Sequence, residues 1–146
     1  MTEAIRWLRI SYWAGAVVDA VAAAQMLWPP LFRLGMGLPG FAPGVEYQYA
    51  MGMGASLMVG WTALLVWADR RPMERKGVLP LTVFPVIAGL AANQARGVLS
   101  GFLPAPAVLP IWALQCGLGV LFLWSYWRAR KAELAPTSSA TGMTAA

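Results

Sequence analysis

The sequence predicts an all-α, polytopic membrane protein that folds as a four-transmembrane-helix bundle. Three observations predict this fold. The 146-residue chain is 59% hydrophobic and only 12% charged, with a mean hydropathy of +0.59, which leaves too few polar side chains to cover a soluble surface. Its apolar residues gather into four stretches, each close to the ~20 residues that a helix needs to cross a bilayer. Its basic residues lie in short clusters between those stretches, as in proteins that use charge to fix their orientation in a membrane.

The four apolar stretches are each bounded by residues that end a helix. The predicted helices span about residues 10–28, 47–68, 78–97 and 108–127. Pro29 and Pro30 end the first, because proline lacks the backbone N–H that a helix interior needs. A loop rich in glycine and proline follows over residues 31–44. The polar turn DRRPMERKG joins the second helix to the third over residues 69–77, and a proline-rich connection precedes the fourth.

The chain has the length of one domain. We expect a transmembrane domain over residues 1–133 and a disordered tail over residues 134–146, because the last residues, APTSSATGMTAA, are small and polar and offer nothing to bury.

Lys and Arg are unevenly shared between the two predicted sides of the membrane. Nine lie before the first helix, in the central turn or after the fourth helix: Arg6, Arg9, Arg70, Arg71, Arg75, Lys76, Arg128, Arg130 and Lys131. Only Arg33 and Arg96 fall on the other side. Short loops rich in Lys and Arg stay in the cytoplasm. The sequence therefore predicts a multi-pass protein of a bacterial or archaeal cytoplasmic membrane, with both termini cytoplasmic.

Several classes of site are missing from the sequence. The chain has no histidine and a single cysteine, Cys116, so the commonest metal and haem ligands and paired-thiol motifs are absent. It has no glycine-rich phosphate loop and no nucleophile elbow. The basic clusters are not arranged along one continuous face, as nucleic-acid readers require. We therefore predict no cofactor, no metal site, no assigned catalytic residue and no nucleic-acid partner.

Small residues recur every four positions in three of the predicted helices. The stripes are Ser11, Gly15, Asp19 and Ala23; Gly52, Ser56 and Gly60; and Gly89, Asn93 and Gly97. Helices in lipid associate through close backbone approach and hydrogen bonds rather than through the hydrophobic effect. We expect these stripes to face one another or a second copy of the chain.

Asp19 is the most informative single residue. It lies nine residues after the predicted helix start at Ile10, which at about 1.5 Å per residue places it about 13 Å deep. An Asp near the bilayer centre costs about 2.5–3.5 kcal/mol, so it should be protonated, paired or in a wet cavity. Two roles follow: a proton site in a carrier, or a protonated group that bonds a carbonyl or Gln115 as glue between helices.

Further polar residues complete a candidate intramembrane site with Asp19. They are Asn93, Gln94, Arg96, Gln115 and Glu46. We expect Glu46 to pair with Arg96, because both lie near the same level of the non-cytoplasmic side, and the whole set to line a polar pocket open to that side. Pro85 should kink the third helix beside this set, which either opens the pocket or is a tolerated bend.

One part of the chain resembles known sequences. The stretch GWTALLVWADRRPMERKGVLPLTVFPV from Gly60 to Val86, with Asp19, Pro29-Pro30 and the run EYQYAMGMGASLM over residues 46–58, resembles uncharacterised small four-helix membrane proteins of prokaryotes. The architecture is also similar to the broad DoxX-like group, by analogy of fold. The resemblance implies the fold and no activity.

Three functions stay open on the sequence alone. The favoured one is a structural or accessory subunit of a membrane complex, in contact with the lipid bilayer and either with other membrane subunits or with copies of itself. The alternative is a small proton-coupled carrier or channel that uses Asp19. The second alternative is a membrane enzyme on a lipid-like substrate, which would have to work with Asp, Glu, Arg and Tyr alone.

Overall fold

A computed structural model describes residues 2–134, and these residues form helices joined by short connections, with no β-strand among them. The helices are α1 (Thr2–Leu27), α2 (Pro29–Met36), α3 (Val45–Asp69), α4 (Val78–Leu81), η1 (Thr82–Ile87), α5 (Ala88–Leu99) and α6 (Ala105–Leu134). The predicted tail lies outside the described residues except for Leu134, which ends α6. The all-α fold class is confirmed.

Four helical segments are long and apolar enough to cross a membrane. They are α1, α3, the continuous stretch α4–η1–α5 (Val78–Leu99) and α6. Their outward faces carry large apolar side chains such as Val17, Leu57 and Val120, which are 57%, 77% and 69% exposed. A surface of this kind is suited to lipid, so the chain is a multi-pass membrane protein.

Two of the spanning helices are longer than hydropathy predicts. Helix α1 begins at Thr2 rather than near residue 10, and α6 continues to Leu134 rather than ending near 127. The added turns are polar and are joined by an ion pair between Arg128 and Glu3, 2.8 Å apart. Hydropathy marks only the lipid-facing part of a helix, whereas backbone hydrogen bonds continue beyond the bilayer.

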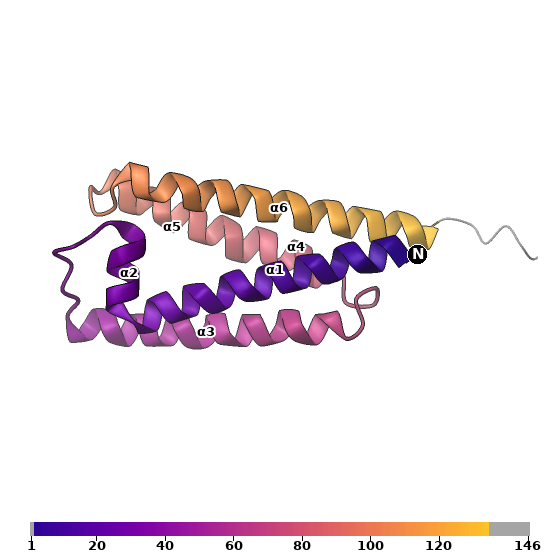
Figure 1. Cartoon of the computed structure of the whole chain (residues 1–146), viewed down its shortest axis with the longest axis horizontal. Helices are drawn as coiled ribbons and strands as arrows, with labels where there is room; N and C mark the ends of the chain where they lie inside the picture. The colour runs from indigo at the N-terminus through magenta and orange to yellow at the C-terminus, as the bar shows by residue number, and fades with distance from the viewer. Residues whose placement is uncertain (1, 135–146) are drawn as a thin grey trace, which may run out of the picture.

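Helix α2 lies in a segment where the sequence predicts a loop. Pro29 and Pro30 do end α1, but they also form the first turn of α2, where the missing N–H groups are not needed. Gly37 ends α2 with φ of 63°, a left-handed conformation that glycine adopts without strain. Helix α2 lies crosswise at one end of the bundle (Figure 1).

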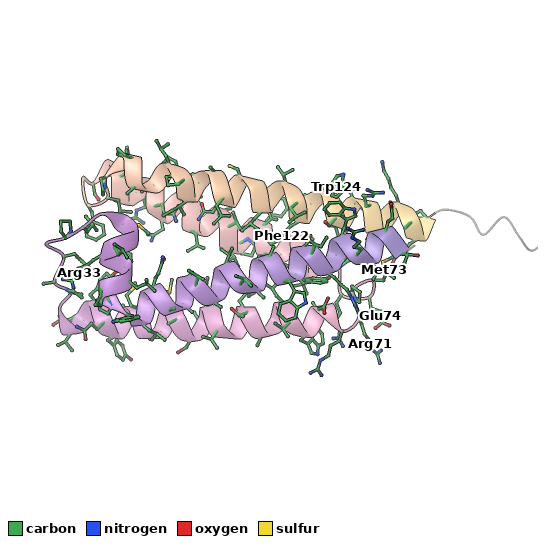
Figure 2. All side chains as sticks on the ribbon, in the orientation of Figure 1. Arg33, Arg71, Met73, Glu74, Phe122 and Trp124 are labelled. Atoms are coloured by element: carbon green, nitrogen blue, oxygen red, sulfur yellow. The ribbon has the colours of Figure 1, made fainter. Side chains whose placement is uncertain are left out.

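The two ends of the bundle differ in charge. The start of α1, the 70–77 turn and the last turn of α6 lie together at one end, which we call the termini end; the opposite end, crossed by α2, we call the α2 end (Figure 1). Within residues 2–134, the termini end holds four ion pairs: Arg9–Asp69, Arg71–Glu74, Arg128–Glu3 and Lys76–Glu133. Figure 2 shows Arg71 and Glu74 at this end and Arg33 at the other.

The hydrophobic core fills the half of the bundle nearest the termini end. Its fully buried members are Leu8, Tyr12, Ala16, Leu65, Ala68, Leu79, Phe122 and Ala129. Two hydrogen bonds reinforce it: Ser11 Oγ donates to Ser125 Oγ at 2.8 Å, joining α1 to α6, and Tyr12 Oη donates to the Pro72 carbonyl at 3.3 Å. All four spans therefore close against one another in this half.

The α1 stripe of small residues packs inside the bundle. Ser11, Gly15, Asp19 and Ala23 are all buried. A Cβ atom added at Gly15 would lie 2.9 Å from Phe122 Cζ and 3.0 Å from Leu65 Cδ1. Glycine is therefore needed here for α1 to approach α3 and α6.

The glycines of the other two stripes, on α3 and α5, differ in how closely they are packed. A Cβ added at Gly97 would lie 2.7 Å from Leu103 Cδ1, but one added at Gly52, Gly60 or Gly89 would meet nothing within 4 Å. Ser56 is exposed and donates to the carbonyl of Gly52 in its own helix at 3.0 Å. Within the single chain, Gly52, Gly60 and Gly89 therefore contact no other stripe. The alternative expectation, that these stripes face a second copy of the chain, stays a prediction, because spacing shows that a face is small and not which way it points.

Pro85 lies within η1, a π-helical turn that widens the third span. Proline cannot donate to the carbonyl four residues earlier, and a wider turn accommodates it without breaking the helix. The first residue of this turn, Thr82, is buried, donates to the Val78 carbonyl at 2.9 Å and accepts from Trp61 Nε1 at 3.1 Å.

Candidate functional site

A cavity of about 710 Å³ lies in the half of the bundle nearest the α2 end. All four spans and α2 contribute to its lining. It begins where the core ends, at Gly15, Thr82 and Phe122, and reaches the connection between α5 and α6 at Phe102 and Leu103. Its volume lies within the range of about 300–1,000 Å³ that is typical of small-molecule sites.

The cavity brings together five of the six residues that the sequence proposes as an intramembrane site. They are Asp19 from α1, Asn93, Gln94 and Arg96 from α5, and Gln115 from α6. Gln25 of α1 also lines the cavity, near α2. Three helices distant in the sequence thus direct polar groups into one space.

Glu46 lies outside this cavity. It is exposed in the first turn of α3, where the positive end of the helix dipole favours an acid. The predicted pair between Arg96 and Glu46 is not among the four ion pairs formed within residues 2–134. The sequence places both residues at the same end of the bundle, but Glu46 is exposed and does not line the cavity that Arg96 lines.

The polar residues lie at graded depths along the cavity. Asp19 precedes the end of α1 by eight residues and Gln115 follows the start of α6 by ten, so at about 1.5 Å per residue both lie roughly 12–15 Å from the α2 end. Arg96 precedes the end of α5 by only three residues, about 5 Å from the α2 end. The carboxyl is therefore deep and the guanidinium is near the rim.

Three side-chain oxygens of this set have no hydrogen-bond partner within the described residues. They are Asp19 Oδ2, Gln94 Oε1 and Gln115 Oε1. Asp19 is only 7% exposed and takes part in none of the ion pairs of residues 2–134. The predicted bond from Asp19 to Gln115 is not formed in this structure. Buried polar groups are almost always satisfied, so these oxygens call for water or another polar group in the cavity.

Comparison of the chain with family models, curated proteins and solved structures gives no match. The resemblance to DoxX-like proteins therefore stays a prediction. Function has to be inferred from the geometry of the cavity itself.

Most of the remaining lining is apolar and adaptable. Four methionines contribute to it: Met26, Met36, Met51 and Met58. Thioether side chains have several rotatable bonds and adjust to ligands of irregular shape. Sequence reasoning did not select these methionines, because methionine in a membrane helix is ordinarily a lipid-facing or packing residue.

An aromatic cluster lies at the α2 end of the cavity and consists of Phe32, Phe41, Tyr47 and Phe102. Phe41 packs on Phe32, Tyr47 and Phe102 with ring centroids 5.4, 5.1 and 5.8 Å away. The cluster links α2 to α3 and to the connection between α5 and α6. The sequence does not single out this cluster, because Phe41 lies in the loop over residues 37–44 and reaches the other rings only through the fold of that loop.

The cavity lining holds one acidic and one basic side chain. Among the described residues that line the cavity, Asp19 is the only carboxylic acid and Arg96 is the only basic residue. Within residues 2–134 no three acidic or thiol side chains gather in the manner of a metal site, and Cys116 is exposed. The arrangement suits a polar or charged group bound at Asp19, with apolar walls for the rest of a ligand.

Proposed function

We propose that this protein is a small proton-coupled carrier, which binds an amphiphilic molecule in the cavity and uses Asp19 as its proton site. One observation favours a carrier over a subunit or an enzyme: a buried, unpartnered carboxyl lies deep in a large cavity of a membrane bundle. Intramembrane acids that face a cavity commonly serve in proton relays and substrate pathways.

The two halves of the bundle support the same proposal. The core of Leu8, Tyr12, Leu79 and Phe122 separates Asp19 from the termini end, whereas the cavity extends from Asp19 to the α2 end. A site that is reached from one side and sealed on the other is one state of an alternating-access cycle. Transport then requires the four spans to separate at the core.

The proposal predicts that Asp19 exchanges its proton with water. In the reconstituted protein, the infrared band of a protonated carboxyl should disappear as pH is raised from mildly acidic to mildly alkaline. The isosteric variant Asp19→Asn should lack this band, and Glu46→Gln, which removes a carboxyl outside the cavity, should retain it.

A band that keeps its intensity over this pH range would contradict the carrier. It would show that the carboxyl is sealed from water, and Asp19 would then have a structural role, as a hydrogen-bonding group between helices. Ala22→Phe provides a second comparison, because Ala22 also lines the cavity and the larger ring should hinder proton exchange without removing the carboxyl.

The orientation and the membrane are part of the proposal. We place the termini end in the cytoplasm of a bacterium or archaeon, because nine of the eleven Lys and Arg residues belong to that end. In a Cys116→Ser background, Ser100→Cys should react with an impermeant maleimide added to intact cells, and Gly77→Cys should not. The opposite labelling would reverse the orientation.

The accessory-subunit function remains a second candidate, favoured by the face of α3 that carries Gly52, Ser56 and Gly60. Both glycines meet open space, and Ser56 is exposed. Small residues of this kind let a second helix approach closely, from another copy of the chain or from a different subunit. If this role is correct, the protein purified in mild detergent should never be found as a single chain; a monodisperse monomer would argue against it.

A further inference from the structure

The unpartnered groups of the cavity define what a ligand has to offer. Asp19 Oδ2, Gln94 Oε1 and Gln115 Oε1 are all hydrogen-bond acceptors. A glutamine amide can turn to present its NH₂ group instead, but an ionised carboxylate only accepts. The ionised form of Asp19 therefore requires a donor, and a positively charged donor satisfies it best, because charge-assisted hydrogen bonds are about twice as strong as neutral ones.

Charge in the lining favours the same kind of group. Arg96 lies roughly 7 Å nearer the α2 end than Asp19, from the positions of the two residues in their helices, and the two form no ion pair. The deep end of the cavity therefore keeps an acid without a counter-charge. A buried charge normally needs a partner, and a single cationic group from a ligand would supply it.

The walls fit an apolar body attached to such a group. Phe32, Tyr47, Phe102 and Phe122 line the cavity together with its methionines. Aromatic faces attract cations as well as apolar groups, and thioethers adjust to different shapes. Only one acid lies among these walls within the described residues, so a second positive charge on the ligand would find no partner and would meet Arg96 at the rim.

We infer that the cavity binds an apolar amine in its protonated form, with the ammonium group on Asp19 and the apolar body among the methionines and aromatic rings. This inference rests on the proposed function, since it names the substrate class of the same site. It also orients the ligand, because the ammonium group lies deepest and the apolar body extends toward the α2 end.

A matched series of ligands tests the inference on the full chain. Phenylbutylamine, phenylbutanol and phenylbutyrate share one apolar body and carry a cation, a neutral donor and an anion. Binding is measured by titration calorimetry of the protein in lipid nanodiscs, with protein-free nanodiscs as the control for partitioning into lipid. We expect the amine to bind at least about tenfold more tightly than the alcohol, and the carboxylate to bind least.

Two variants test whether Asp19 causes the preference for the amine over the alcohol. Asp19→Asn should bind the amine and the alcohol equally, because the variant keeps the shape of the side chain and loses its charge. Glu46→Gln should keep the wild-type preference, because Glu46 lies outside the cavity. The comparison among the three ligands in the wild-type protein needs no variant, so it stands even if Asp19→Asn folds poorly.

The possible outcomes distinguish a failure of this inference from a failure of the proposed carrier function. Equal binding of amine and alcohol, or tighter binding of the carboxylate, would contradict the inference that the ligand is an amine. The cavity would still be a ligand-binding site. If none of the three ligands binds beyond the protein-free control, or if Ala22→Phe leaves their binding unchanged, both the amine inference and the proposed carrier function are contradicted.

Discussion

Replacing Gly15 by leucine is expected to destabilise the bundle by about 3 kcal/mol. Even a single added carbon at this position would lie 2.9 Å from Phe122 Cζ and 3.0 Å from Leu65 Cδ1, and both of those side chains are fully buried. Neither can move without disturbing the core, so α1 would have to separate from α3 and α6. Unfolding in detergent mixtures with increasing dodecyl sulfate, followed by circular dichroism, measures the change.

Gly117→Leu is the matched control for this prediction. Gly117 lies in the middle of α6, is exposed, and has nothing within 4 Å of an added Cβ. Leucine there should not destabilise the fold, because it gains helix propensity and meets only lipid. If Gly15→Leu and Gly117→Leu unfold alike, the close packing of α1 against Phe122 is wrong.

Asp19→Leu is expected to have the second largest effect, and it should act on membrane insertion. On insertion scales a central Asp costs about 2.5–3.5 kcal/mol and a Leu gains about 0.3–0.6 kcal/mol, so the first helix should insert more readily by at least about 3 kcal/mol. That difference corresponds to roughly a hundredfold change in the insertion equilibrium. A translocon assay that scores glycosylation of flanking sites measures it on the isolated helix.

Gln25→Leu is the comparison for the insertion experiment. Gln25 lies two residues before the end of α1, near the interface, where polar side chains cost less. Its replacement should change insertion far less than Asp19→Leu does. Equal effects would place Asp19 near the interface and not deep in the bilayer, and would remove the physical basis for its proposed role as a buried proton site.

Much of the fold follows from hydropathy, and its exceptions have local causes. Four apolar stretches were enough to predict the four spans, because lipid demands that backbone polar groups be satisfied within each segment. Helix α2 was missed because Pro29 and Pro30 end one helix and begin another with the same chemical property. The π-helical turn at Pro85 was expected only as a kink, since a missing N–H does not specify how the backbone adapts.

The residues of the candidate site and their gathering around one pocket were predictable, but the pairing among them was not. Polar side chains are rare in a membrane span, so Asp19, Gln94 and Gln115 stand out from their neighbours, and the structure places them around one cavity. Their partners do not follow from depth alone. Glu46 matches Arg96 in level along the bundle, but only Arg96 lines the cavity. Which way each side chain points depends on how packing rotates its helix.

The same limit applies to the small-residue stripes. Gly15 and Gly60 have equivalent sequence patterns, yet one is enclosed by Phe122 and Leu65 and the other is exposed. A repeat of four marks a face that permits contact. Which face is used depends on the large residues opposite, and these lie far away in the sequence.

The position of Asp19 between the sealed core and the cavity has an electrical consequence. A proton that reaches it from the α2 end moves about 12 Å across a membrane core about 30 Å thick, and so crosses at most roughly two-fifths of the membrane potential. Moving one charge through the whole potential is worth about 2.3 kcal/mol per 100 mV, so the contribution for this proton is at most about 0.9 kcal/mol per 100 mV. Protonation of Asp19 should therefore depend on voltage, and the infrared band of its carboxyl in vesicles held at a potassium diffusion potential would show it. The sign of that dependence would also reveal which leaflet contains α2.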